Sequence, residues 1–342
     1  MLNDRFLRAC RREPVDVTPV WFMRQAGRYM ADYRALRERH SLLEICRHPE
    51  LAVAVTLQPV DLIDVDAAIL FSDLLLPFTP MGLTFDFVKG EGPAIERPIR
   101  NAADVERLRD YEPREALAHV LETIRLLRTE LTDRVPLIGF GGAPFTLAAY
   151  AIEGGPSTNY AKAKAFMYAQ PEAWHRLCGR FARLIGDYMC AQIEAGAQAI
   201  QIFDSWAGQL SRADYREFAM PHTRHIFDTL AGSGVPTIHF GVNTGAILPD
   251  MRDAGGDVIG VDWRAPLDEA WSTIGPDRGI QGNLDPVRLL GPKAAMFAAA
   301  DDVLRHAGGR PGHIFNLGHG VLPQTPIEHV QALAAHVHGY RA

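Results

Sequence analysis

The chain has 342 residues, of which 47% are hydrophobic, enough to bury one large core or two medium ones. Its formal net charge is -6 and it has no long run of Lys or Arg, which argues against nucleic-acid binding. The N-terminal residues are charged, and no apolar run approaches the ~18 residues that span a membrane. We therefore expect a soluble, cytoplasmic protein that binds no membrane and holds any anionic ligand with a local arginine cluster.

Short apolar segments alternate with helical patterns along the whole chain. The segments that read as buried parallel strands are 19–22, 66–71, 136–140, 199–203, 236–240, 258–262, 279–282 and 313–317. The helical patterns between them cover 34–62, 102–131, 171–195, 212–231, 266–274 and 287–307. About eight strands joined by crossover helices predict an α/β protein, a single (β/α)8 TIM barrel over residues 1–342. A doubly wound sheet shares this alternation, but no G-x-G-x-x-G follows the first strand.

Two further elements carry local signals. Residues 83–97 alternate weakly around a turn at 89–92, which predicts a β-hairpin inserted after strand two, at the barrel mouth. The closing helix has Thr325 as its predicted N-cap and Pro326 at its first position. Glu328 then completes a predicted capping box.

Polar residues follow the predicted strands at the points where the strands end. Barrel enzymes place their catalytic groups at the carboxyl ends of the strands and in the loops that follow. The segments in these places, after strands one, two, three, four and eight, are 23–29, 72–73, 139–150, 204–208 and 318–320. We expect them to converge on one mouth.

These segments resemble the uroporphyrinogen decarboxylase family. Pro19–Tyr29 looks like the family's N-terminal motif, and Gly139–Tyr150, followed by Glu153-Gly154-Gly155, looks like its second. Four shorter segments recur in the family's order: Phe71–Asp73, Phe203–Gly208, Gln281–Pro286 and Asn316–Gly320. The resemblance spans nearly the whole chain. The stretch 239–245 is less typical, and it carries none of the family's main substrate residues.

The resemblance implies an enzyme of porphyrin and heme biosynthesis that removes the four acetate carboxyl groups of uroporphyrinogen III, giving coproporphyrinogen III and CO2. Protonation of a pyrrole α-carbon creates an electron sink beside each acetate, so neither a cofactor nor a metal is required. A propionate lies one carbon too far from the ring to use this sink. Family members are homodimers, and we expect a homodimer here on the same ground.

Arg24 and Arg28 are the predicted catalytic clamps, because a guanidinium can bind a carboxylate bidentately. Their four-residue spacing places them on one face if the loop is helical. Gln25, Ala26 and Gly27 lie between them and are predicted to contribute to substrate binding. The alternative interpretation is a pair of ordinary surface arginines.

Asp73 is the predicted catalytic anion. In the family, the matching aspartate accepts hydrogen bonds from the pyrrole N–H groups, and its charge would stabilise the protonated macrocycle. Its ordinary interpretation is a helix N-cap after a strand. Tyr150, Ser205 and His319 match the family's remaining polar contacts to substrate, although each alone could be structural.

Three other functions remain to be weighed. A corrinoid-related methyltransferase would bind zinc through a His-x-Cys pair and a later Cys, but His239 is followed by Phe240-Gly241. The cysteines all fall on predicted helices and are expected to be reduced: Cys10, Cys46, Cys178 and Cys190. A non-catalytic tetrapyrrole-binding protein or a structural barrel would not require Arg24, Arg28 and Asp73 together.

Overall fold

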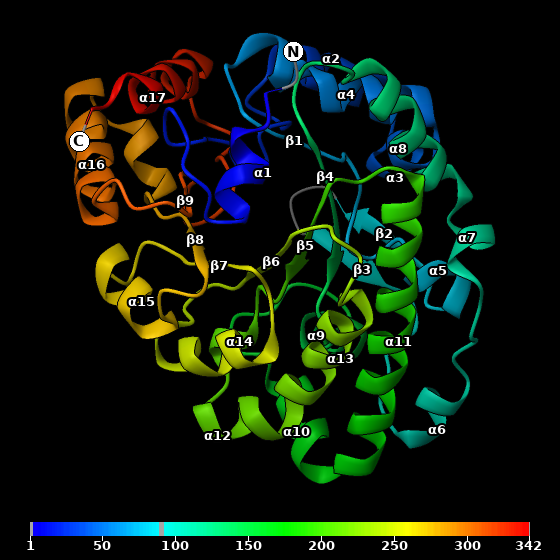
Figure 1. Ribbon diagram of the computed structural model, residues 1–342. Coiled ribbons are helices and arrows are strands. Elements are labelled where there is room, and N and C mark those ends of the chain that lie inside the picture. The colour runs from blue at the N-terminus through cyan, green and yellow to red at the C-terminus, as the bar shows by residue number, and fades with distance from the viewer. Residues whose placement is uncertain (1–2, 89–91, 342) are drawn as a thin grey trace.

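The computed structural model describes residues 3–88 and 92–341. Within them, parallel strands form one curled sheet in which neighbours along the chain are mostly neighbours in the sheet (Figure 1). Its order is β1 (Ala68–Ile69), β4 (Leu137–Gly142), β5 (Ala199–Phe203), β6 (Thr237–Phe240), β7 (Val258–Gly260), β8 (Gly279–Gln281) and β9 (His313–Ile314). This confirms the predicted α/β class with a parallel sheet.

An extended segment stands where the first strand was predicted. Val20 forms a parallel bridge with Phe315, whose N–H donates to the Pro19 carbonyl at 2.8 Å. On the other side, the Asp66 N–H donates to the Val20 carbonyl at 2.7 Å. This segment therefore lies between β9 and the residues that lead into β1, but it pairs through a single bridge and not as a regular strand.

Helices surround the sheet and connect its strands (Figure 1). They are α1 (Arg5–Cys10), α2 (Ala31–Arg39), α3 (Leu42–Arg47), α4 (Pro49–Leu62), α5 (Phe78–Met81), α6 (Ala102–Glu106), α7 (Pro113–Ala116), α8 (Ala118–Glu130), α9 (Pro144–Glu153), α10 (Ala161–Ala169), α11 (Pro171–Ala195), α12 (Arg212–Asp214), α13 (Met220–Leu230), α14 (Leu248–Ala254), α15 (Leu267–Ile274), α16 (Lys293–Ala307) and α17 (Ile327–Gly339).

The strands are buried on both faces, as their continuous apolar runs predict. Ile200, Ile238, Ile259 and Ile280 have no exposed surface, and each such side chain contributes roughly 1.5–3 kcal/mol by its transfer from water. The helix α11 packs the apolar side of its long amphipathic pattern on this core. Its bounds agree with the predicted helix over 171–195.

Two predicted helices are each divided into three. The pattern over 34–62 breaks at Ser41, whose hydroxyl accepts from the Glu44 N–H at 3.1 Å while the Glu44 carboxylate accepts from the Ser41 N–H at 2.6 Å. This capping box starts α3, and Pro49 starts α4. The pattern over 102–131 divides into α6, α7 and α8.

The capping box predicted for the last helix is wrong. Pro326 has extended backbone angles, φ -65° and ψ 131°, so α17 begins at Ile327 with Pro326 at its N-cap and no side-chain cap. The Thr325 hydroxyl is buried and has no hydrogen-bond partner among the residues described. It lies one residue too early to reach the first turn, since the residue before a proline is also restricted to extended conformations.

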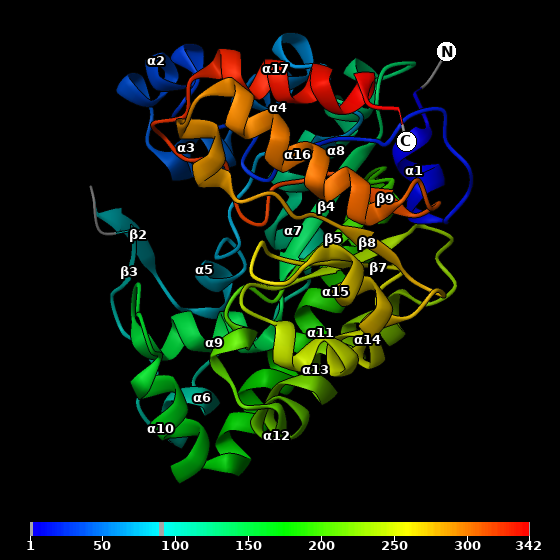
Figure 2. The same ribbon diagram turned by 90° about the vertical axis from the view of Figure 1, so that its left-hand side faces the viewer.

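Two further strands lie outside the main sheet. β2 (Phe85–Val88) and β3 (Gly92–Ile95) pair antiparallel, with Phe85 opposite Ile95. Most of the turn predicted at 89–92 lies outside the described residues. The Ile95 N–H donates to the Gly154 carbonyl at 2.8 Å, and Figure 2 shows the pair beside α5 and α9. The pair follows β1 and α5 in the chain, and it stands at the carboxyl ends of the main strands.

Candidate active site

A cavity of about 270 Å3 opens at the carboxyl ends of the strands. Phe140 and Phe203 from β4 and β5 contribute to its wall, and Phe87 and Pro93 reach it from β2 and β3. The sequence-predicted site residues that line it are Arg24, Ala26, Asp73, Tyr150, Ser205 and His319. Segments far apart in the sequence are thus brought together by the parallel register of the strands.

The apolar part of the wall was not predicted. It includes Phe71, Leu74, Phe140, Phe203 and Trp206, and the rings of Phe140 and Phe203 meet edge to face with centroids 5.5 Å apart. Strand position could have indicated the two phenylalanines, because they sit near the ends of β4 and β5. Such a wall favours the face of an aromatic ring.

The loop that carries Arg24 is held by a buried glutamine. Gln25 has no exposed surface; its side-chain oxygen accepts from the Phe22 N–H at 3.1 Å, and its NH2 donates to the Ala67 carbonyl at 3.0 Å. Arg24 itself has φ 58°, in the left-handed region. A Cβ on Gly320 would lie 2.4 Å from the Arg24 Cδ, so only glycine lets that side chain pass.

Arg28, unlike Arg24, does not line the cavity. Its side chain is exposed, and neither Arg28 nor Gly27 is among the described residues that line the cavity. The helical loop that would place the two arginines on one face does not form, because the left-handed backbone of Arg24 is incompatible with a helix. The condition for a common helical face, a helical loop, is therefore not met.

Asp73 is the carboxylate of the cavity. Its Oδ1 accepts from the Leu75 N–H at 2.8 Å, and Arg24 is close enough for its charge to favour the ionised form. Burial outweighs both effects and raises the pKa of Asp73 to about 6. The carboxylate is thus mostly ionised at neutral pH, but it is poorly solvated. Side chains with a strongly shifted pKa are often found at functional sites.

His319 and Tyr150 present hydrogen-bond donors. The Gly320 N–H donates to Nδ1 of His319 at 2.7 Å, which leaves the imidazole proton on Nε2. Burial, helped by the positive charge of Arg24, lowers the pKa of His319 to about 4, so the ring is neutral at pH 7. Burial and the Asp73 carboxylate raise the pKa of Tyr150, which keeps its hydroxyl protonated.

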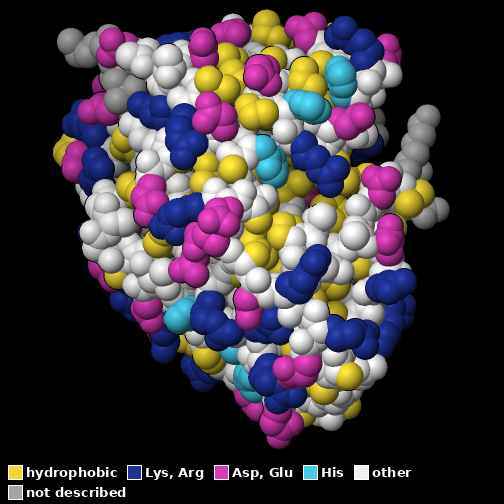
Figure 3. Space-filling view, turned by 90° about the vertical axis from the view of Figure 1, so that its right-hand side faces the viewer, with side chains coloured by type: hydrophobic (Ala, Val, Ile, Leu, Met, Phe, Trp, Pro, Cys, Tyr) yellow, Lys and Arg dark blue, Asp and Glu magenta, His cyan; other side chains and the backbone are white. Residues whose placement is uncertain are grey.

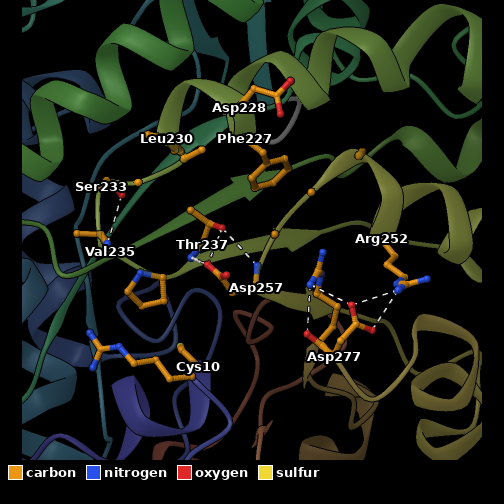
Figure 4. A pocket seen from close by; sticks show the side chains of 18 of the residues that line it. Cys10, Phe227, Asp228, Leu230, Ser233, Val235, Thr237, Arg252, Asp257 and Asp277 are labelled. Carbon is orange, nitrogen blue, oxygen red and sulfur yellow. Dashed lines mark hydrogen bonds and ion pairs between the residues drawn. The ribbon is translucent and has the colours of Figure 1, made fainter.

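A larger depression, of about 910 Å3, lies at the opposite ends of the strands, between the α1 segment and the loops around β6 and β7 (Figure 4). Two of its arginines pair with one of its carboxylates. Asp277 accepts from Arg252 at 3.1 Å and from Arg278 at 3.2 Å, and Asp257 accepts from the Thr237 N–H at 2.8 Å. Its lining, taken from the described residues, includes none of the predicted site residues.

The part of the chain that the structure describes has no group of three or more His, Cys, Asp or Glu side chains arranged to hold a metal. The cysteines are free: Cys10, Cys46 and Cys178 are buried and Cys190 is partly buried. His239 is fully buried, with Nδ1 3.2 Å from the Met251 carbonyl. Its partner in a zinc pair would stand two residues later, where the chain has Gly241.

The outer surface mixes charges of both signs. Figure 3 shows Lys and Arg side chains interspersed with Asp and Glu over one face of the molecule. Among the helices described, none combines the length and apolar character needed to cross a membrane. These findings agree with the charge pattern of the sequence.

A curled parallel sheet with polar side chains around a cavity at its carboxyl ends defines the class of barrel-type α/β proteins. Residues 1–340 match the family described as Uroporphyrinogen decarboxylase (URO-D). The chain belongs to the uroporphyrinogen decarboxylase family.

Full-length relatives agree with this assignment. The chain is 59% identical to "Uroporphyrinogen decarboxylase" of Sorangium cellulosum over 337 residues, which cover 98% of this chain and 96% of the relative. It is 56% identical to the protein of the same name from Carboxydothermus hydrogenoformans, with the same coverage. Among solved structures, a methyltransferase from Methanosarcina mazei superposes with a TM-score of 0.79 at 23% identity, covering 98% of this chain and 97% of that one, which shows the common fold alone.

Proposed function

We propose that the chain is a cofactor-independent carboxy-lyase that converts uroporphyrinogen III into coproporphyrinogen III and four CO2. The observation that carries the proposal is that residues matching the family's motifs line one cavity of a chain 59% identical to a uroporphyrinogen decarboxylase. These are Arg24, Asp73, Tyr150, Ser205 and His319.

Each decarboxylation follows from the chemistry of a pyrrole. Protonation of the ring α-carbon next to the acetate-bearing carbon gives an iminium-like cation. The electrons of the C–CO2⁻ bond flow into this cation, CO2 leaves, and an exocyclic methylene remains. Protonation of the methylene and loss of the proton from the α-carbon give a methyl group. Each cycle therefore consumes one proton and releases one CO2.

Asp73 is proposed to accept hydrogen bonds from the pyrrole N–H groups and to stabilise the cationic ring. Its partly buried charge is suited to this role, because a carboxylate with few hydrogen-bond donors around it interacts strongly with a developing positive charge. Binding of N–H donors should lower its pKa from about 6 and keep it ionised through the reaction. Burial of the carboxylate destabilises the free enzyme, and its interaction with the cationic ring offsets this destabilisation in the transition state.

The arginines are proposed to divide the carboxylates between them. A cavity of about 270 Å3 is smaller than a whole tetrapyrrole, so the reacting pyrrole enters while much of the macrocycle spans the mouth. Arg24, an exposed side chain at the wall of the cavity, would hold the acetate near the reacting ring. Arg28, exposed outside the cavity, would bind a peripheral propionate or acetate.

Tyr150, Ser205 and His319 are proposed to orient the substrate carboxylates by hydrogen bonding. His319 acts in this scheme as a neutral Nε2–H donor, because its pKa of about 4 keeps it uncharged. Gln25, Ala26 and Gly27 contribute by shaping the loop and, for Ala26, part of the wall. The group that delivers the proton is left open by this geometry.

The test is incubation with uroporphyrinogen III under anaerobic, reducing conditions, followed by mass spectrometry of the oxidised product. We expect a product with four carboxyl groups, and the loss of any propionate carboxyl would contradict the mechanism. Exhaustive chelation, with metal content checked, should leave turnover unchanged. Loss of activity on chelation with rescue by zinc would instead favour a methyltransferase-type metal site.

We also infer the following about assembly. The Val20 segment completes an eight-stranded barrel between β9 and β1, residues 1–342 form one domain, and the β2–β3 pair is a hairpin inserted after the second barrel strand. The enzyme works in the cytoplasm as a homodimer. Light scattering at micromolar concentration tests the dimer, and a monomeric mass with full activity would contradict it.

A further inference from the structure

Two side chains of the β2–β3 pair line the cavity, although this pair lies outside the main sheet (Figure 2). They are Phe87 and Pro93, which stand directly opposite each other in the antiparallel register. Side chains alternate between the two faces of a strand, and residues directly opposite each other project from the same face. Phe87 and Pro93 therefore form one apolar face on the cavity, which we call the Phe87–Pro93 face.

Burial along β2 follows the same alternation. Phe85 is buried and Phe87 is partly buried, whereas Asp86 is exposed and Val88 keeps 44% of its surface in contact with solvent. The Phe87 ring meets Phe85 edge to face with centroids 5.9 Å apart, and Phe85 in turn meets Phe78 of α5 at 6.4 Å. The core thus supports Phe87 on one side, while the side chain also lines the cavity.

The Phe87–Pro93 face is fixed to the helix that carries Tyr150. The Gly154 N–H donates to the Tyr150 carbonyl at 2.9 Å where α9 ends, and the Gly154 carbonyl accepts from the Ile95 N–H of β3 at 2.8 Å. A Cβ on Gly155 would lie 3.0 Å from the Pro93 carbonyl oxygen, so the chain after α9 packs closely on β3. The apolar face and Tyr150 are therefore held together at the same cavity.

The two kinds of side chain around the cavity suit two parts of one ligand. Phe87 and Pro93 offer only hydrocarbon surface, which gains from contact with an apolar ring and gives no hydrogen bond to a carboxylate. Arg24 and Asp73, which line the same cavity, bind carboxylates and N–H groups instead. A pyrrole of uroporphyrinogen has an aromatic ring between charged substituents, so it requires surfaces of both kinds.

We propose that Phe87, with Pro93 opposite it, is a substrate-binding residue that packs on the pyrrole ring in the cavity and keeps the macrocycle bound between successive decarboxylations. This inference rests on the proposed function, because it takes the ring to be a pyrrole of uroporphyrinogen. The acetate carboxyl groups leave one at a time, so a macrocycle that dissociates early is released with some of them still in place. Weaker packing speeds this release, since affinity changes within one interface lie mostly in the dissociation rate.

Phe87→Ala in the full-length enzyme tests this role. We expect KM for the first decarboxylation to rise about tenfold, the effect of losing part of the apolar contact of one phenylalanine, with little change in kcat. With substrate in excess, partly decarboxylated products should accumulate severalfold relative to coproporphyrinogen, as measured by mass spectrometry of the oxidised products. Phe87→Leu keeps apolar bulk but loses the aromatic ring, so both changes should have the same sign and be smaller.

Val88→Ala is the matched control, because it truncates the next residue of the same strand, whose exposed side chain lies on the opposite face. We expect its KM and its product distribution to equal those of the wild type. A loss of folded enzyme lowers the total rate but leaves the distribution of products unchanged, so the distribution separates substrate binding from a structural role. Wild-type KM and product distribution in folded Phe87→Ala, or equal changes in Val88→Ala, would overturn the proposal.

The same measurements distinguish this inference from the proposed function. A wild-type enzyme that produces no coproporphyrinogen contradicts the function itself. A wild-type enzyme that produces it, together with a Phe87→Ala enzyme that behaves identically, contradicts only the role of Phe87.

Discussion

The carboxyl and amino ends of the parallel sheet differ in whether their carboxylates are paired with arginines. At the carboxyl ends, a cavity of about 270 Å3 holds a carboxylate, Asp73, whose pKa is raised to about 6 by burial. At the amino ends, a depression of about 910 Å3 holds Asp277, whose pKa is lowered by a hydrogen bond from Arg252. The smaller space keeps a carboxylate without an ion pair to any described residue, whereas in the larger one Asp277 is paired with Arg252 and Arg278.

This difference distinguishes a site from a surface depression better than volume does. Paired charges already interact with each other in the folded protein, so they add little to the binding of a ligand. A poorly solvated charge destabilises the free protein and is relieved when a ligand supplies the missing partner. Replacing the carboxylate at the carboxyl ends should therefore lower activity and raise stability. Replacing the carboxylate at the amino ends should change stability alone.

The largest effect is expected for Asp73→Asn. The amide keeps the shape and one acceptor oxygen but lacks the charge that we propose stabilises the protonated macrocycle. Turnover should fall about a hundredfold, on the order of 2.7 kcal/mol by analogy with loss of an oxyanion-hole group. Single-turnover kinetics and a binding titration measure the two contributions. Near-normal chemistry with weakened binding would mean that Asp73 only positions the ring.

The same substitution should stabilise the free protein. The folded pKa of Asp73, about 6, lies above its ordinary 3.8, so the ionised form is disfavoured by folding. The wild type loses stability as pH rises through about 6, and Asp73→Asn does not. We expect the variant to be more stable by on the order of 2 kcal/mol at pH 7 and equal near pH 3.5. Urea unfolding at both pH values measures this, and a destabilised variant at pH 7 would contradict the unfavourable burial of charge.

The next largest effect is expected for substitutions of Arg24 and Arg28. Arg24→Lys keeps the charge and loses the planar fork, so kcat/KM should fall tenfold or more, about 1.4 kcal/mol. Arg28→Lys should also lose about tenfold or more if Arg28 is a bidentate clamp, but with the loss mainly in KM because it lies outside the cavity. Steady-state kinetics on both folded variants distinguish them. An Arg28→Lys enzyme with wild-type kinetics would remove Arg28 from the site.

A pH profile separates His319 from Asp73. We expect kcat/KM of the wild type to decline below about pH 6, since this parameter reports the free enzyme and Asp73 is the group with that pKa. His319, with a pKa of about 4, should not titrate there. His319→Gln should lower kcat/KM a few-fold, as expected for one neutral hydrogen bond, and leave the midpoint near 6. Disappearance of the acid limb in this variant would assign the limb to His319.

The smallest effect is expected at the amino ends. Asp277→Asn removes ion pairs with Arg252 and Arg278, and the Asp277 side chain is 48% exposed, so unfolding free energy should fall by no more than about 1 kcal/mol. Because the folded pKa of Asp277 is lowered, this stabilisation is present above its ordinary pKa and lost as pH falls. Turnover should not change. A large loss of activity would make the larger depression a functional site.

The sequence by itself determined the fold class and predicted six of the residues that line one cavity. Apolar runs such as 199–203 and the long helix 171–195 indicate their structures directly, because burial fixes the period of the hydrophobic pattern. The rule that polar residues follow strand ends brought Arg24, Asp73 and His319 together without coordinates. Such features depend on local pattern and on a topology that the pattern implies.

The tertiary structure decided what depends on exact backbone angles and on neighbours distant in sequence. The left-handed backbone of Arg24 keeps the loop to Arg28 from being helical, and extended Pro326 moves the start of α17 away from Thr325. The raised pKa of Asp73 and the place of Trp206 beside Tyr150 likewise arise from packing between segments. A local pattern records which residues are buried, but desolvation and hydrogen-bond direction depend on everything that surrounds a group in three dimensions.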